Sequence, residues 1–121
     1  MTGVEKTVRK MIEAGGYSVD GLVYLLRNEF AARLEFYFAL MFLVAYLILG
    51  VSWPLIVTST VLFLILVAVE ALNTAIEVII DRISPEISKT GKHAKDLGSL
   101  AVMCLLFANW VFAAYAVSTT F

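Results

Sequence analysis

Four residues that can bind cations or move protons stand close together in an otherwise apolar stretch: Glu70, Asn73, Glu77 and Asp81. Each residue of an α-helix is rotated by about 100° from the last, so these four side chains fall within roughly 80° of one another. The spacing therefore predicts one acidic stripe along a helix. Its oxygens are hard ligands suited to Mg²⁺, and one of its carboxylates can act as a general base.

The composition indicates the environment of this stripe. Of the 121 residues, 61% are hydrophobic and 16% are charged, and the mean hydropathy is +0.91. Soluble domains are only about 45–50% apolar, so the composition predicts a small integral membrane protein. Ionisable groups at membrane depth are costly and by default mark a function.

Three apolar segments approach or exceed the ~20 residues that cross about 30 Å of hydrocarbon. We expect transmembrane helices at about residues 34–51, 55–80 and 97–117, with residues 82–96 as a cytoplasmic loop. From Leu55 to Asp81 the second helix is roughly 40 Å long, so it must tilt or protrude. The predicted fold class is an all-α membrane protein with a single membrane domain, residues 1–121.

The first 33 residues form a separate, charged element. Their apolar residues recur at helical spacing on either side of Gly15-Gly16: Val4, Val8, Met11, Ile12, then Leu22, Leu25, Leu26, Phe30. We expect a broken amphipathic helix on the cytoplasmic membrane surface, the alternative being a solvated leader that only carries charge. A cleaved signal peptide is not expected, because these residues contain no continuous apolar region.

The basic residues predict the orientation in the membrane. All nine Lys and Arg residues lie before the first span or between the second and third. With three spans, both segments fall on one side, and the positive-inside rule makes that side cytoplasmic. We expect a multi-pass protein of the inner membrane, with its amino terminus inside and its carboxyl terminus outside.

Depth separates the members of the stripe. Because the chain enters the second span from outside, Glu70 lies near the inner edge of the hydrocarbon, whereas Glu77 and Asp81 reach the headgroups. Phosphoryl transfer from a soluble nucleotide to a membrane-dissolved alcohol needs metal ligands and a base at this level. Lys95 and Asp96, on the same side, can add a phosphate-binding cation and a further acid.

Two other interpretations remain open. Membrane acids can pair with basic residues of neighbouring helices and serve only to hold the helices together. Acids in small helical membrane proteins also carry ions, so a small ion or drug transporter is the other functional class. Against transport, the acids cluster at one end of the span, whose outer half offers only Thr58, Ser59 and Thr60.

The residues 69–77, VEALNTAIE, are followed by Asp81-Arg82 and by the residues 94–99, AKDLGS. This combination resembles the signature of the prokaryotic integral-membrane diacylglycerol kinase family. The likeness extends to Gly16-Tyr17-Ser18, Gly21-Leu22 and Asn28-Glu29, and so covers nearly the whole chain.

The resemblance implies a homotrimer of three-span subunits, each with an amphipathic surface helix and with active sites formed between subunits. It implies transfer of the γ-phosphate of MgATP to the hydroxyl of a membrane lipid, with Mg²⁺ as the cofactor. Glu70 would be the general base, and Glu29 and Glu77 would hold the metal. The expected partners are ATP, the lipid and further copies of the chain, without nucleic acid.

The resemblance also implies two sets of contact residues. The ATP-binding set is Lys10, Tyr17, Glu29, Asn73, Glu77, Glu86, Lys95 and Asp96. The lipid-binding set is Ala14, Gly16, Ser18, Ala31, Arg33, Glu35, Glu70 and Ser99. This chain departs from the family at Lys10, where the family has arginine, and at Ile87 and Ser88, where it has an aromatic residue and histidine.

Neither a G-x-x-x-x-G-K-[ST] loop nor the H-R-D and D-F-G motifs of protein kinases occurs in the sequence. Catalysis would then depend on positioning and on metal electrostatics. A related branch of the family phosphorylates undecaprenol, and the Asp81-Arg82 and Gly98-Ser99 pairs resemble the diacylglycerol branch more closely. We expect a diacylglycerol kinase that makes phosphatidic acid, with undecaprenol kinase as the alternative.

Overall fold

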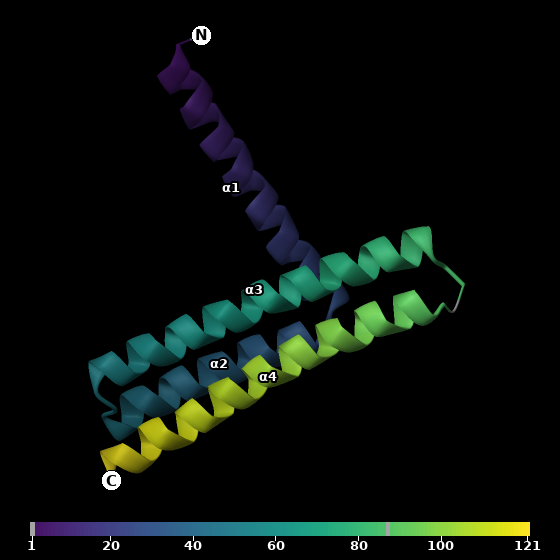
Figure 1. Cartoon of the computed structure of the whole chain (residues 1–121). Coiled ribbons are helices and arrows are strands. Elements are labelled where there is room, and N and C mark those ends of the chain that lie inside the picture. The colour runs from purple at the N-terminus through teal and green to yellow at the C-terminus, as the bar shows by residue number, and fades with distance from the viewer. Residues whose placement is uncertain (1, 87) are drawn as a thin grey trace.

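The computed structural model describes residues 2–86 and 88–121 as four α-helices. They are α1 (Gly3–Asn28), α2 (Phe30–Leu49), α3 (Trp53–Ile83) and α4 (Lys89–Thr120). Helices α2, α3 and α4 lie alongside one another, and α1 projects steeply from this bundle (Figure 1). The last three are long and apolar enough to cross a membrane, which confirms the predicted all-α membrane class.

The bundle is apolar both inside and outside. A buried cluster joins the end of α2, the start of α3 and the end of α4, and consists of Tyr46, Val51, Ile56, Ala113 and Ala116. The outer faces expose large apolar side chains along their whole length, for example Leu40, Ile48, Leu64, Leu100 and Phe107. Soluble monomers rarely expose such continuous apolar surface, whereas lipid covers it in a membrane protein.

The connection between α2 and α3 is tight. Gly50 ends α2 with φ of 73°, the left-handed conformation that glycine adopts without steric cost. Pro54 stands in the first turn of α3, where its missing N–H has no helical partner to lose. These two residues turn the chain back at the end of the bundle where the carboxyl terminus also lies (Figure 1).

Helix α1 is continuous, so the prediction of a break at Gly15-Gly16 was wrong. Neither glycine has a positive φ, and Gly50 is the single such residue within 2–86 and 88–121. A glycine inside a helix costs only about 1 kcal/mol relative to alanine. The reciprocal bonds between Thr2 and Glu5 form a capping box that stabilises the start of the helix. The break comes instead at Glu29, whose backbone is extended.

The segment 82–96, predicted as a loop, is also mostly helical. Helix α3 continues to Ile83 and α4 begins at Lys89, which leaves residues 84–88 as the connection. The Ser88 hydroxyl caps α4 by accepting the Gly91 N–H at 3.0 Å. The loop prediction rested on the polar side chains of this segment. A helix keeps its backbone hydrogen bonds beyond an apolar stretch, so polar side chains there do not indicate irregular backbone.

Candidate active site

Glu70 is buried where α3 faces α2. Its side chain is 4% exposed, and its carboxyl group faces that of Glu35 on α2, which is 9% exposed. Within the described residues, Glu70 Oε1 has no hydrogen-bond partner. A buried carboxylate oxygen without a partner is an expensive arrangement, which indicates a group that interacts with something bound. Glu35, predicted as a lipid contact, thus lies directly beside the predicted base.

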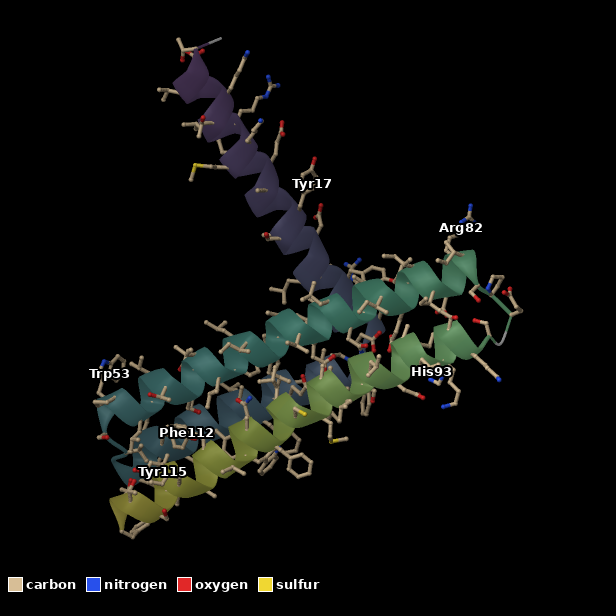
Figure 2. The ribbon with its side chains drawn as sticks, in the orientation of Figure 1. Tyr17, Trp53, Arg82, His93, Phe112 and Tyr115 are labelled. Carbon is tan, nitrogen blue, oxygen red and sulfur yellow. The ribbon has the colours of Figure 1, made fainter. Side chains whose placement is uncertain are left out.

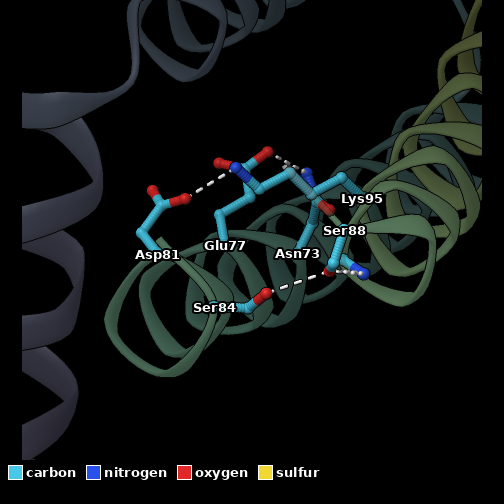
Figure 3. A network of polar contacts seen from close by, with 7 residues as sticks. Asn73, Glu77, Asp81, Ser84, Ser88 and Lys95 are labelled. Atoms are coloured by element: carbon cyan, nitrogen blue, oxygen red, sulfur yellow. Dashed lines mark hydrogen bonds and ion pairs between the residues drawn. The ribbon is translucent and has the colours of Figure 1, made fainter. Parts of the chain in front are cut away.

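Asn73 and Glu77 continue the stripe toward the polar end of α3. Asn73 Nδ2 donates a hydrogen bond to Glu77 Oε1 at 3.3 Å, so the two side chains share one helix face as predicted (Figure 3). Gly98 of α4 lies against the Asn73 amide, because a Cβ placed on Gly98 would overlap Asn73 Oδ1. The missing side chain of Gly98 therefore makes the room that the amide needs.

Replacing Gly98 with alanine should disturb this contact. We expect the Gly98→Ala variant to lose about 1–3 kcal/mol of unfolding free energy through overpacking, and to turn over more slowly because Asn73 no longer aligns Glu77. Thermal unfolding in detergent and steady-state kinetics measure the two effects. Gly15→Ala is the matched control, because nothing lies within 4 Å of its Cβ. A Gly98→Ala protein with unchanged stability and turnover would contradict the packing argument.

Charged side chains from three elements gather around Glu77. Its charged neighbours are Glu29, Lys95 and Asp81. Lys95 Nζ lies 2.6 Å from Asp81 Oδ1, an ion pair that joins α4 to α3 (Figure 3). Glu29 stands between α1 and α2, and its side chain makes no capping hydrogen bond there. Its carboxylate therefore remains available for a ligand.

The donor atoms fit a metal ion that arrives with a nucleotide. In the described part of the chain, no three His, Cys, Asp or Glu side chains are grouped to hold a metal by themselves. Glu29 and Glu77, however, supply two neighbouring carboxylates. Mg²⁺ typically uses one or two protein carboxylates and completes its shell with water and phosphate oxygens. Two carboxylates are therefore sufficient for a metal bridging nucleotide phosphates.

The remaining predicted ATP residues do not meet Glu77 within one chain. Lys10 and Tyr17 are exposed on the part of α1 that projects from the bundle, as Figure 2 shows for Tyr17. Glu86 lies in the connection after α3, where its Oε1 accepts the Ser84 hydroxyl at 3.1 Å. Asp96 pairs with Lys92 at 2.6 Å. The departure from the family at Ile87 lies outside the described residues.

The predicted lipid residues are spread over all four helices. Those other than Glu35 and Glu70 lie on α1, at the start of α2 and on α4: Ala14, Gly16, Ser18, Ala31, Arg33 and Ser99. All of these are exposed except Arg33. Arg33 Nη1 donates to the carbonyl oxygens of Leu26 and Arg27 at 2.8 and 3.0 Å, so it caps the end of α1.

Sequence reasoning did not assign a role to two neighbours of the stripe. Thr74 is 6% exposed and its Oγ1 has no hydrogen-bond partner in residues 2–86 and 88–121. Gly98 entered only through the likeness of the Gly98-Ser99 pair to the diacylglycerol branch, without its contact to Asn73. Thr74 stands four residues after Glu70, a spacing that places both on one helix face and that could have identified it.

Comparison with known proteins identifies the family of this chain. The family model described as prokaryotic diacylglycerol kinase matches residues 16–117. The chain is similar to the diacylglycerol kinase of a Sinorhizobium species, with 46% identity over 110 residues, which cover 91% of this chain and 80% of that protein. It is also similar to the diacylglycerol kinase of Escherichia coli strain K12, with 39% identity over 97 residues, or 78% of this chain and 77% of the relative.

A third relative is more distant in sequence. The diacylglycerol kinase of Haemophilus influenzae is 32% identical over 103 residues, which cover 83% of this chain and 87% of that protein. The residues matched by the family model include the acidic stripe of α3 and the Lys95-Asp96 pair of α4. The chain therefore belongs to the prokaryotic diacylglycerol kinase family of lipid kinases.

Proposed function

We propose that the chain transfers the γ-phosphate of MgATP to the hydroxyl of diacylglycerol, giving phosphatidic acid and ADP. One observation carries the proposal: the buried Glu70, whose Oε1 has no hydrogen-bond partner among the described residues, stands on the same helix face as Glu77, around which Glu29 and Lys95 gather. A base in the apolar layer can meet a lipid hydroxyl. The charged group two turns away can meet a triphosphate in water.

In the proposed reaction, Glu70 accepts the proton of the lipid hydroxyl and the lipid oxygen attacks the γ-phosphorus. A new P–O bond forms as the bond between the γ-phosphorus and the bridging oxygen of ADP breaks. Lys95 neutralises phosphate charge, and Asn73 orients the Glu77 carboxylate through its amide N–H. Glu29 and Glu77 would hold Mg²⁺, which supplies electrostatic stabilisation of the phosphate oxygens when bound.

The proposal includes a homotrimer with sites formed between subunits. Its support is the direction of α1, which projects away from the bundle (Figure 1) and carries Lys10 and Tyr17. A second copy would be needed to bring these residues to a nucleotide. The distribution of basic residues supports an inner-membrane location with the amino terminus in the cytoplasm and the carboxyl terminus outside.

The choice of lipid can be tested directly. With MgATP in detergent micelles, the purified protein should phosphorylate a short-chain diacylglycerol faster than a polyprenol at the same mole fraction. Initial rates from radiolabelled γ-phosphate transfer measure both. The names of the relatives support this order. The reverse order would assign the undecaprenol reaction, and ion or drug flux in proteoliposomes without ATP consumption would favour a transporter.

A further inference from the structure

A groove of about 680 Å³ lies between the second half of α1 and the second half of α3. Its walls are mostly apolar, and small residues leave its space open: Gly21 on α1 and Ala68, Ala71 and Ala75 on α3. Sites for small molecules usually measure about 300–1,000 Å³ and combine apolar walls with a few placed polar groups. The groove has the size and polarity of a site for part of a lipid.

Thr74 supplies the buried polar group in this groove. Ser18 also lines it, but the Ser18 hydroxyl already donates to the Ala14 carbonyl at 3.0 Å. The third hydroxyl belongs to Tyr24, which is half exposed. The Thr74 hydroxyl, by contrast, is buried and has no partner within the described residues. Such a group costs free energy unless a bound molecule satisfies it.

Other threonines of this chain differ from Thr74, because their hydroxyls bond to the backbone of their own helix. Thr7, Thr58 and Thr60 each donate their hydroxyl to the carbonyl four residues earlier, at 2.9 Å in every case. Thr74 has the same opportunity, because the carbonyl of Glu70 stands four residues before it. No such bond is present in the described structure, and Thr74 is one of the residues that line the groove.

The position of Thr74 relates it to the proposed base. Residues four apart lie on one face of an α-helix, about 6 Å apart along its axis. In a diacylglycerol the nearer ester is attached to the carbon next to the one that bears the free hydroxyl, so both groups fit within this span. A long-chain polyprenol has no ester at that place.

We propose that the groove between α1 and α3 holds an acyl chain of the lipid acceptor, and that the Thr74 hydroxyl donates a hydrogen bond to the ester carbonyl next to the reacting hydroxyl. This contact places the lipid hydroxyl at Glu70 and favours an ester lipid over a simple alcohol. The inference rests on the proposed lipid kinase function and adds a residue that selects the substrate.

The test compares Thr74→Val with wild type on two lipids: a short-chain diacylglycerol and the matching 1,2-dialkylglycerol, whose ether oxygens are poor acceptors. One neutral hydrogen bond corresponds to about 3- to 10-fold in kcat/KM for the diester. We expect that loss with the diester, little change with the diether, and an unchanged KM for MgATP. Thr74→Ser should recover the diester activity. Thermal stability should stay equal or rise, because valine removes an unsatisfied polar group.

Thr60→Val is the matched control, because that hydroxyl is already bonded to the carbonyl of Ile56. Suppose that wild type phosphorylates the diester. If Thr74→Val then lowers kcat/KM equally for both lipids, or for neither, the Thr74 contact is refuted and the kinase function stands. If wild type phosphorylates no lipid, the proposed function fails, and the inference fails with it.

Discussion

Replacing Glu70 with glutamine should lower lipid phosphorylation by about 10²–10⁴-fold, the usual contribution of a general base. The variant loses the proposed acceptor of the lipid proton but keeps nearly the same shape in its buried site. Binding of MgATP should persist, because Glu77, Glu29 and Lys95 are untouched. Radiolabelled phosphate transfer gives the rate, and equilibrium binding of a fluorescent nucleotide analogue gives the affinity.

Glu13→Gln is the control for the Glu70 variant. Glu13 is exposed on α1, where it pairs with Arg9 at 3.7 Å, so the same substitution there should leave turnover near the wild-type value. The Glu35→Gln variant distinguishes the roles of the two facing carboxyl groups. If Glu70→Gln retains near-normal turnover while Glu35→Gln loses it, the base is Glu35 and the assignment of Glu70 is wrong.

Replacing Glu77 with glutamine should have the second largest effect. Glu77 is a proposed metal ligand, and loss of such a ligand removes several kcal/mol of transition-state stabilisation, so turnover should fall by more than about 100-fold. The concentration of Mg²⁺ needed for half-maximal rate should rise as well, because one of two protein carboxylates is gone. A magnesium titration of the rate, together with nucleotide binding in the presence and absence of Mg²⁺, measures both.

The two predictions differ in their response to magnesium. Additional Mg²⁺ should recover part of the activity of Glu77→Gln but none of that of Glu70→Gln, because only the former weakens metal binding. Glu77→Asp keeps a carboxylate on a shorter side chain, so its turnover should lie between that of wild type and that of Glu77→Gln. A Glu77→Gln enzyme with a wild-type magnesium requirement would remove Glu77 from the metal site.

The helices were predictable where a single physical constraint acts. The thickness of the hydrocarbon sets the length of an apolar run, and this located the three spanning helices. The helix ends were not predictable in the same way, since α3 and α4 continue into water where hydropathy no longer marks them. The helix break at Glu29 was also missed, because glycine content is a weaker signal than the caps and side-chain bonds that decide where a helix ends.

The sequence by itself determined that Glu70, Asn73 and Glu77 share one face of one membrane helix, because helical periodicity is a local property of the chain. Tertiary structure decided what that face meets: Glu35 across from Glu70, Gly98 against Asn73, Glu29 and Lys95 around Glu77. These contacts depend on how α2 and α4 pack against α3. Thr74 shows the same division, since its place in the helix is local, whereas the groove that it lines exists only because α1 packs beside α3.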